Sequence, residues 1–121
     1  MEKENNLKTK SFSFALDIIK FIDIIKSRDV IIQEISKQLI RSATSIGANI
    51  TEAQGGTTKN DFANFLSYAL KSSNETKFWL CLLKDSKKVN YNNIEELIIR
   101  VEELGRMLGA SIMTIKGKKQ A

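Results

Sequence analysis

The sequence predicts an all-α protein, an antiparallel up-down-up-down four-helix bundle that forms one domain over residues 1–121. No proline occurs in the 121 residues, and proline is the residue that most strongly breaks a helix interior. Apolar residues recur at steps of three and four in four separate stretches, the period of an amphipathic helix. The connections between these stretches are short, so we expect successive helices to pack as antiparallel neighbours.

The first helix is expected over residues 9–26 and ends at the polar run Ser27-Arg28-Asp29. Its apolar residues recur at the spacing that places side chains on one face of a helix. This predicted buried stripe consists of Phe12, Ala15, Ile18 or Ile19, Ile22 and Ile25. Phe14, Phe21 and Ile24 are further apolar residues that fall outside the stripe.

The second helix is expected over residues 30–54, followed by the stop signal Gly55-Gly56. Its predicted buried seam is continuous and consists of Ile32, Ile35, Leu39, Ala43, Ile46, Ile50 and Ala53. The middle of this helix, residues 42–49, is made almost entirely of small side chains and includes Gly47. A glycine inside a helix costs about 1 kcal/mol relative to alanine. We therefore expect another helix backbone to approach closely at this point.

The third helix is expected over residues 59–85, where Thr58 and Asp61 have the spacing of a capping box. Its predicted core face consists of Phe62, Phe65 or Leu66, Ala69, Leu70, Ser73, Thr76, Leu80 and Leu83. Phe78 and Leu82 form a second apolar patch behind this face, with Trp79 between the two. The third helix, like the first, therefore has more than one apolar surface.

The fourth helix is expected over residues 92–116, with Asn92 as its N-cap and Glu95 three residues later. Its predicted seam consists of Ile94, Leu97 or Ile98, Val101, Leu104, Leu108, Ile112 and Ile115.

Apolar residues beyond one stripe per helix predict that the protein associates with copies of itself. Exposing several large apolar groups in one area creates a patch that favours association, and large aromatic side chains are the strongest anchors in interfaces. The predicted interface residues are Phe21, Ile24, Phe78, Trp79 and Leu82. The alternative is that these side chains pack under loops or inside a wide monomer core.

The composition offers little for catalysis. The chain has no histidine and one cysteine, Cys81, whereas histidine is the usual general base and a common metal ligand. The run from Gly55 to Lys59 has the composition of a phosphate loop, but its residues are in the wrong order and follow a helix. No catalytic residue, metal, cofactor or small-molecule substrate is therefore predicted, and the protein is not expected to be an enzyme.

The formal net charge is +5, from 19 basic and 14 acidic residues. A basic surface can attract nucleic acid or an acidic protein, although such a charge can also serve solubility alone. The candidate phosphate contacts are Lys37, Arg41, Lys116, Lys118 and Lys119. No apolar run approaches the roughly 20 residues that span a bilayer, and no apolar signal core follows Met1. We expect a cytoplasmic protein with no membrane partner.

The stretch Arg41-Ser42-Ala43-Thr44-Ser45-Ile46-Gly47-Ala48-Asn49-Ile50-Thr51-Glu52-Ala53 resembles the central signature of the 23S rRNA-intervening-sequence proteins, a family also called four-helix bundle proteins. The segments 59–62 and 69–76 are similar to its second block, and the resemblance extends over roughly residues 10–116.

The resemblance implies a small bacterial helical protein that assembles as a ring-like homopentamer. Most members have no established activity, and a related branch comprises accessory proteins of diversity-generating retroelements that bind a reverse transcriptase and nucleic acid. The polar positions that match the family pattern would then be structural or inter-subunit residues, namely Arg41, Ser45, Asn49, Glu52 and Glu75.

Two hypotheses follow for the function. The first is a non-enzymatic homo-oligomeric scaffold that offers a basic surface to RNA, DNA or an RNA-associated protein. The second is a purely structural protein–protein interaction module with no role for nucleic acid.

Overall fold

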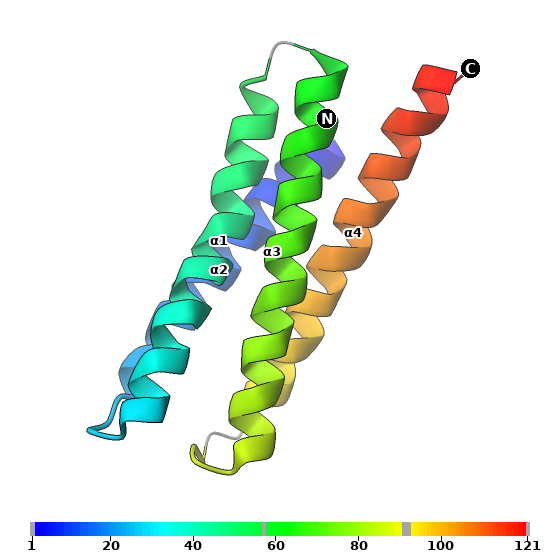
Figure 1. Cartoon of the computed structure of the whole chain (residues 1–121). Coiled ribbons are helices and arrows are strands. Elements are labelled where there is room, and N and C mark those ends of the chain that lie inside the picture. Colours follow the sequence, from blue (N-terminus) through cyan, green and yellow to red (C-terminus); the bar gives the residue numbers. More distant parts are fainter. Residues whose placement is uncertain (1, 57, 91–92, 121) are drawn as a thin grey trace.

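The computed structural model describes residues 2–56, 58–90 and 93–120, with the side chains of 6–56, 58–90 and 93–117. Its four helices are α1 (Glu2–Ile25), α2 (Val30–Gln54), α3 (Lys59–Ser86) and α4 (Ile94–Gln120). These described residues contain no strand. Successive helices run in alternating directions, and α1 lies diagonally opposite α3, each packing against both α2 and α4 (Figure 1). The predicted all-α four-helix fold is confirmed.

The predicted boundaries hold closely for α2 and α3, whereas α1 and α4 are longer than expected. α1 begins at Glu2 rather than at residue 9. The polar N-terminal segment contains Leu7, which is buried and lies one helical turn from Ser11 on the core side. The burial of Leu7 anchors the additional turns of α1. α4 continues to Gln120, beyond the expected end at residue 116, and the predicted N-cap Asn92 lies outside the described residues.

The cores of α2, α3 and α4 follow the predicted seams, and the predicted stripe of α1 is confirmed at Ile18 and Ile25, which are buried. It is wrong at Phe12 and in leaving out Phe14 and Phe21. Phe12, which was expected inside, is 67% exposed, whereas Phe21 is 0% exposed. The buried face of α1 consists of Leu7, Ser11, Phe14, Ile18, Phe21 and Ile25. Both faces have helical spacing, and this one buries Leu7 together with the two large rings of Phe14 and Phe21.

Small side chains hold α2 close to its neighbours. A Cβ atom added to Gly47 would lie 3.3 Å from the Ser11 hydroxyl oxygen, which confirms the close approach of another helix, α1, at this glycine. On the other side of α2, the Thr76 and Ser42 hydroxyls are hydrogen-bonded at 2.9 Å. These two buried hydroxyls are therefore paired with each other, as interior polar groups require, whereas the buried Ser36 hydroxyl of α2 has no hydrogen-bond partner among the described residues.

Local signals fix the starts of α2 and α3. The Asp29 carboxylate accepts hydrogen bonds from the backbone N–H groups of Ile31 (2.8 Å) and Ile32 (3.2 Å). The Thr58 hydroxyl accepts one from the backbone N–H of Asp61 at 3.0 Å, as its spacing predicts. Lys88 donates to Asp29 at 2.8 Å and so joins the two loops at one end of the bundle. This bond is the main cause that lowers the pKa of Asp29.

Candidate interaction surfaces

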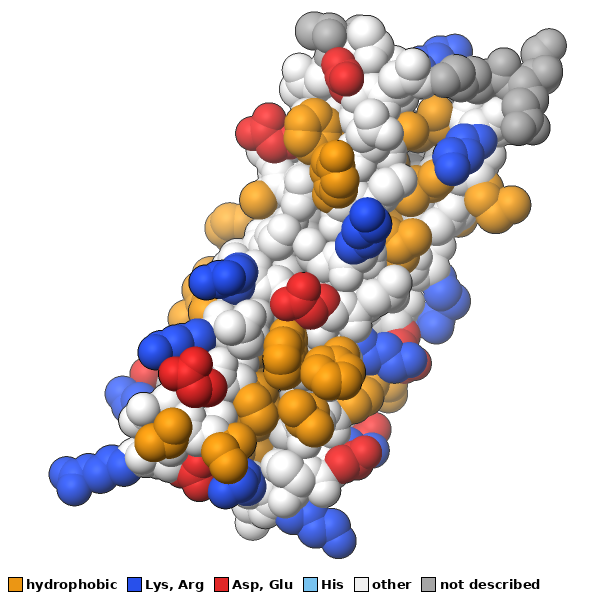
Figure 2. Space-filling model, in the orientation of Figure 1, with side chains coloured by type: hydrophobic (Ala, Val, Ile, Leu, Met, Phe, Trp, Pro, Cys, Tyr) orange, Lys and Arg blue, Asp and Glu red, His pale blue; other side chains and the backbone are white. Residues whose placement is uncertain are grey.

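The outward face of α3 carries the largest aromatic pair on the surface. Phe78 is 57% exposed, Leu82 is exposed and Trp79 is half-buried. The rings of Phe78 and Trp79 meet edge to face, with centroids 4.9 Å apart. The Trp79 indole N–H donates to the Glu75 carboxylate at 3.1 Å, so the only polar atom of this ring is satisfied at the surface. Figure 2 shows hydrophobic side chains gathered on this face of the molecule.

The exposed residues of this face follow one stripe of the helix, which we call the α3 outer seam. Its members recur at steps of three and four and are Tyr68, Lys71, Glu75, Phe78 and Leu82. All five are exposed in the chain, and Lys71 lies over the Tyr68 ring, 5.9 Å from its centroid. A stripe with this period is the geometry by which one helix packs on another. Within the described residues, no other helix covers this seam.

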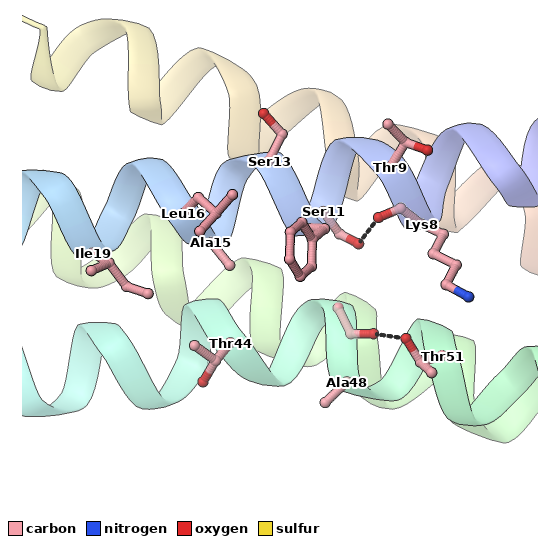
Figure 3. Close-up of a pocket in the computed structure, with 12 residues that line it drawn as sticks. Lys8, Thr9, Ser11, Ser13, Ala15, Leu16, Ile19, Thr44, Ala48 and Thr51 are labelled. Carbon is pink, nitrogen blue, oxygen red and sulfur yellow. Dashed lines mark hydrogen bonds between the residues drawn. The ribbon is translucent and has the colours of Figure 1, made fainter.

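A second apolar surface is concave and lies between α1 and α2 (Figure 3). This α1–α2 groove has a volume of about 710 Å³. Its principal lining is Phe12, Leu16 and Ile19 from α1, with Thr44, Gly47, Ala48 and Thr51 from α2. The α1 side supplies bulky apolar groups and the α2 side supplies small ones, so the space is left by the small residues of α2.

Sequence reasoning missed this groove because it placed Phe12 in the core. The signal was present in the two apolar stripes of α1, of which only one can face inward. The residues of the other stripe, Phe12, Leu16 and Ile19, are the exposed wall of the groove.

The five residues predicted to form the interface between copies do not lie on one surface. Phe78, Trp79 and Leu82 lie together on α3, whereas Phe21 is completely buried in the core. The prediction that Phe21 lies beyond the core is therefore wrong, because its ring completes the inner face of α1. Ile24 is exposed on the side of α1 next to α4, where Asp17 and Arg100 also lie. It is thus separated from the α3 group by the width of the bundle.

The candidate phosphate contacts are also spread out. Lys37 and Arg41 are exposed one turn apart on α2, and Lys37 lies 3.4 Å from Glu34. Lys116 is exposed near the end of α4, at the end of the bundle opposite the start of α2 (Figure 1). The side chains of Lys118 and Lys119 lie outside the described residues. The structure therefore does not gather Lys37, Arg41 and Lys116 into one patch.

The polar positions of the signature have different environments. Ser45 accepts a hydrogen bond from the Ser72 hydroxyl at 2.9 Å and another from the Asn49 amide at 3.0 Å, so this group links α2 to α3. The Glu75 carboxylate accepts a hydrogen bond from Trp79 and forms no ion pair in the part of the chain that the structure describes. Arg41 and Glu52 are exposed.

The two flanks of α4 differ from those of α2, because ion pairs cross them. Arg100 pairs with Asp17 of α1 at an N–O distance of 2.6 Å, and Lys77 of α3 pairs with Glu102 at 2.9 Å. Two more pairs join α4 to its neighbours, Lys10 with Glu103 and Lys84 with Glu95. The bond to Glu102 raises the pKa of Lys77, and the same bond lowers the pKa of Glu102. Among the described residues, no ion pair joins α2 to another helix.

Few groups suited to chemistry occur on these surfaces. Cys81 is a free, half-buried thiol. Within the part of the chain that the structure describes, no group of three or more His, Cys, Asp or Glu side chains could hold a metal ion. No helix in that part is both long and apolar enough to cross a membrane.

Comparisons with known proteins agree with the fold. The model of a family described as 23S rRNA-intervening sequence protein matches residues 3–110. A crystal structure from Bacteroides thetaiotaomicron VPI-5482, described as a protein with unknown function from the S23 ribosomal protein family, superposes with a TM-score of 0.82. It is 36% identical in sequence, and the match covers 92% of this chain and 98% of that one. No curated protein matches the chain.

Proposed function

Because the chain belongs to the 23S rRNA-intervening sequence protein family, we propose that it is a non-enzymatic helical scaffold that assembles as a homopentamer. The observation that supports this most is the pair of unlike apolar surfaces on one chain, the α1–α2 groove and the α3 outer seam. Two different surfaces that contact each other between copies give a head-to-tail arrangement, which closes into a ring when the rotation permits. The number five comes from the family resemblance.

The exposed apolar side chains supply the driving force for this assembly. Fully burying a side chain such as Phe or Leu is worth about 1.5–3 kcal/mol. Phe78 is half exposed in the single chain, so covering it contributes about half of that amount. Phe12, Leu16, Ile19 and Leu82 are exposed as well, and together these groups form the centre of an interface whose aromatic members dominate its energy.

Light scattering coupled to size-exclusion chromatography tests the proposed assembly. We expect a mass five times the 13.7 kDa of one chain, falling toward the monomer mass on dilution. A particle of 13.7 kDa at every concentration would contradict it. A stable particle with another number of subunits would retain the scaffold and correct its stoichiometry.

A contact with RNA or DNA is the second candidate, and one observation favours it. Arg41 is exposed with no ion-pair partner among the described residues, one turn from Lys37. A homo-oligomer would repeat this cationic site in every subunit, so weak phosphate contacts would add up. Binding of this kind weakens steeply with salt.

Fluorescence anisotropy of labelled RNA and DNA across a salt series separates this candidate from a purely protein–protein module. The nucleic-acid role predicts binding at low salt that weakens in Lys37→Ala and is lost at high salt. The absence of binding even at low salt, together with a stoichiometric protein partner that survives nuclease, would support the protein–protein module.

A further inference from the structure

We propose that the α1–α2 groove receives the α3 outer seam of a second copy of the same chain, and that Arg41 of the first copy pairs with the Glu75 carboxylate of the second. This inference rests on the proposed assembly and adds which surfaces meet, in which direction and at which level.

The two surfaces are complementary in shape. Small residues, Gly47 and Ala48, line the α2 side of the groove, and the bulky Phe12 lines its α1 side. Figure 3 shows Leu16 and Ile19 on α1 facing Thr44 and Ala48 on α2. The seam is a row of exposed side chains on a single helix and includes the large groups of Phe78 and Leu82. A ridge of one helix packs into the groove between residues of others. A second groove would place one hollow against another and leave this space unfilled.

The two surfaces lie at the same level along the bundle. Ser11 lies beside Gly47, and Ser45, two residues before Gly47, is hydrogen-bonded to Ser72. Since α2 and α3 are antiparallel, Gly47 is level with Leu70, two residues before Ser72. Ser11, which lies beside Gly47, is therefore level with Leu70 as well.

α1 and α3 run in the same direction (Figure 1). Continuing along both helices therefore places Lys71 level with Phe12, and Phe78 level with Ile19. Copies related by rotation about an axis along the bundle keep both direction and level. The seam of one copy thus meets the groove of the next over its whole length, with apolar Phe78 at the apolar Ile19 end.

Charge complementarity selects the same partner. Ser42 and Thr76 are hydrogen-bonded and therefore level with each other. Because α2 and α3 are antiparallel, the preceding residues Arg41 and Glu75 lie on opposite sides of this level, about 3 Å apart along the bundle, which a long arginine side chain can span. Arg41 is exposed one turn before Thr44, just beyond the residues that line the groove, while Glu75 lies in the middle of the seam. Neither forms an ion pair among the described residues, whereas four ion pairs join α4 to α1 and α3. A second copy supplies each with a partner of opposite charge.

This arrangement is head to tail, because the groove and the seam are on different sides of one chain. It assigns Arg41 to the contact between copies and leaves Lys37 and Lys116 as the phosphate contacts of the second candidate function.

Cysteine cross-linking between separately prepared variants tests the contact. In a Cys81→Ala background, Thr44→Cys places a thiol on the groove and Lys71→Cys places one on the seam. Both positions are exposed and adjoin the hydrogen-bonded Ser45–Ser72 pair. After the two variants are mixed and oxidised, we expect a disulfide-linked pair of unlike chains. Arg106→Cys is the matched control, because Arg106 is exposed on α4 and follows Gly105, which lies beside Ser73. Its mixture with Thr44→Cys should remain unlinked.

The outcomes separate this contact from the assembly itself. Cross-linking of Thr44→Cys alone would show groove against groove and overturn the inference. An assembled particle whose mixed variants do not cross-link would also overturn it while the proposed scaffold stands, whereas a monomeric wild-type protein would overturn both. In the variant carrying both cysteines on one chain, oxidation should give a ladder that stops at the number of subunits in the ring.

A charge exchange tests the ion pair independently. Arg41→Glu and Glu75→Arg should each raise the midpoint concentration of dissociation by about tenfold. The double variant should recover most of the loss, since it restores opposite charges. Additive effects of the two changes would overturn the assigned pair.

Discussion

The α4 side and the α2 side of this bundle are built differently, although both belong to one small fold. Ion pairs cross both flanks of α4, joining it to α1 and to α3. The flanks of α2 are closed by glycine, alanine and hydroxyl side chains. The bulky apolar groups around α2, such as Phe12 and Phe78, are left at the surface.

The difference indicates which side of the molecule faces water. Exposed ion pairs stabilise a fold by little, typically about 0–1 kcal/mol, but they keep a surface well hydrated. Small residues at a helix contact allow close packing and leave hollow space beside it. We therefore interpret the α4 side as the solvent face and the α2 side as the face that meets other copies.

The difference between the two sides requires that α1 bury Phe21 and expose Phe12. Replacing Phe21 is therefore expected to give the largest change in stability. Phe21→Ala removes a completely buried ring and should lower the free energy of unfolding by about 3–5 kcal/mol. Urea denaturation at one fixed subunit concentration measures this change. Met113→Ala, at an exposed position of α4, is the control and should change it by less than about 0.5 kcal/mol. If Phe21→Ala lowered the free energy of unfolding only slightly, α1 would instead bury the stripe that contains Phe12, as the sequence pattern suggested.

A matched pair of charged substitutions compares the two sides directly. Phe78→Asp on the α3 outer seam and Ile99→Asp on α4 alter side chains that are 57% and 58% exposed. We expect the first to weaken assembly by about 30-fold, as for the loss of an aromatic anchor worth about 2 kcal/mol. The second should leave the particle unchanged. Light scattering over a dilution series measures both, and equal effects would remove the distinction between the sides.

The smallest expected effect is a loss of thermal stability in acid, caused by protonation of the carboxylates that pair across the α4 side. The pKa values of Glu102 and Glu103 are lowered by their bonds to Lys77 and Lys10. Carboxyls with lowered pKa values contribute stability that is fully present above the unfolded pKa, near 4.5, and is lost as the pH falls through the folded value. The thermal midpoint should therefore decline below about pH 4.5, less steeply in Glu102→Gln. An identical pH profile in that variant would show that the pair contributes nothing measurable.

Periodicity was sufficient for the fold and for three of the four core faces. The seams of α2, α3 and α4 could be predicted because one apolar stripe dominates each helix, apart from the late patch on α3. In α1 two stripes compete, and spacing alone does not select between Phe12 and Phe14. The decisive residue was Leu7, which lies in a polar segment that appeared to precede the helix.

The surfaces were harder to predict than the elements. Phe78 and Leu82 could be identified as surplus from the α3 pattern alone. The groove could not, because it is formed by residues of two helices whose relative level is set by contacts such as Gly47 with Ser11. The same holds for Arg41 and Glu75, whose nearby levels follow from the Ser42–Thr76 hydrogen bond between antiparallel helices.

The Gly47–Ser11 contact also has a consequence for the evolution of this chain. A Cβ at position 47 would come within 3.3 Å of the Ser11 hydroxyl oxygen, so the two positions share one small volume. A side chain at position 47 requires that Ser11 shift or be replaced by a smaller residue, and glycine at position 47 is what leaves room for serine at position 11. In an alignment of homologues, positions 11 and 47 should therefore covary in size, with their combined side-chain volume nearly constant.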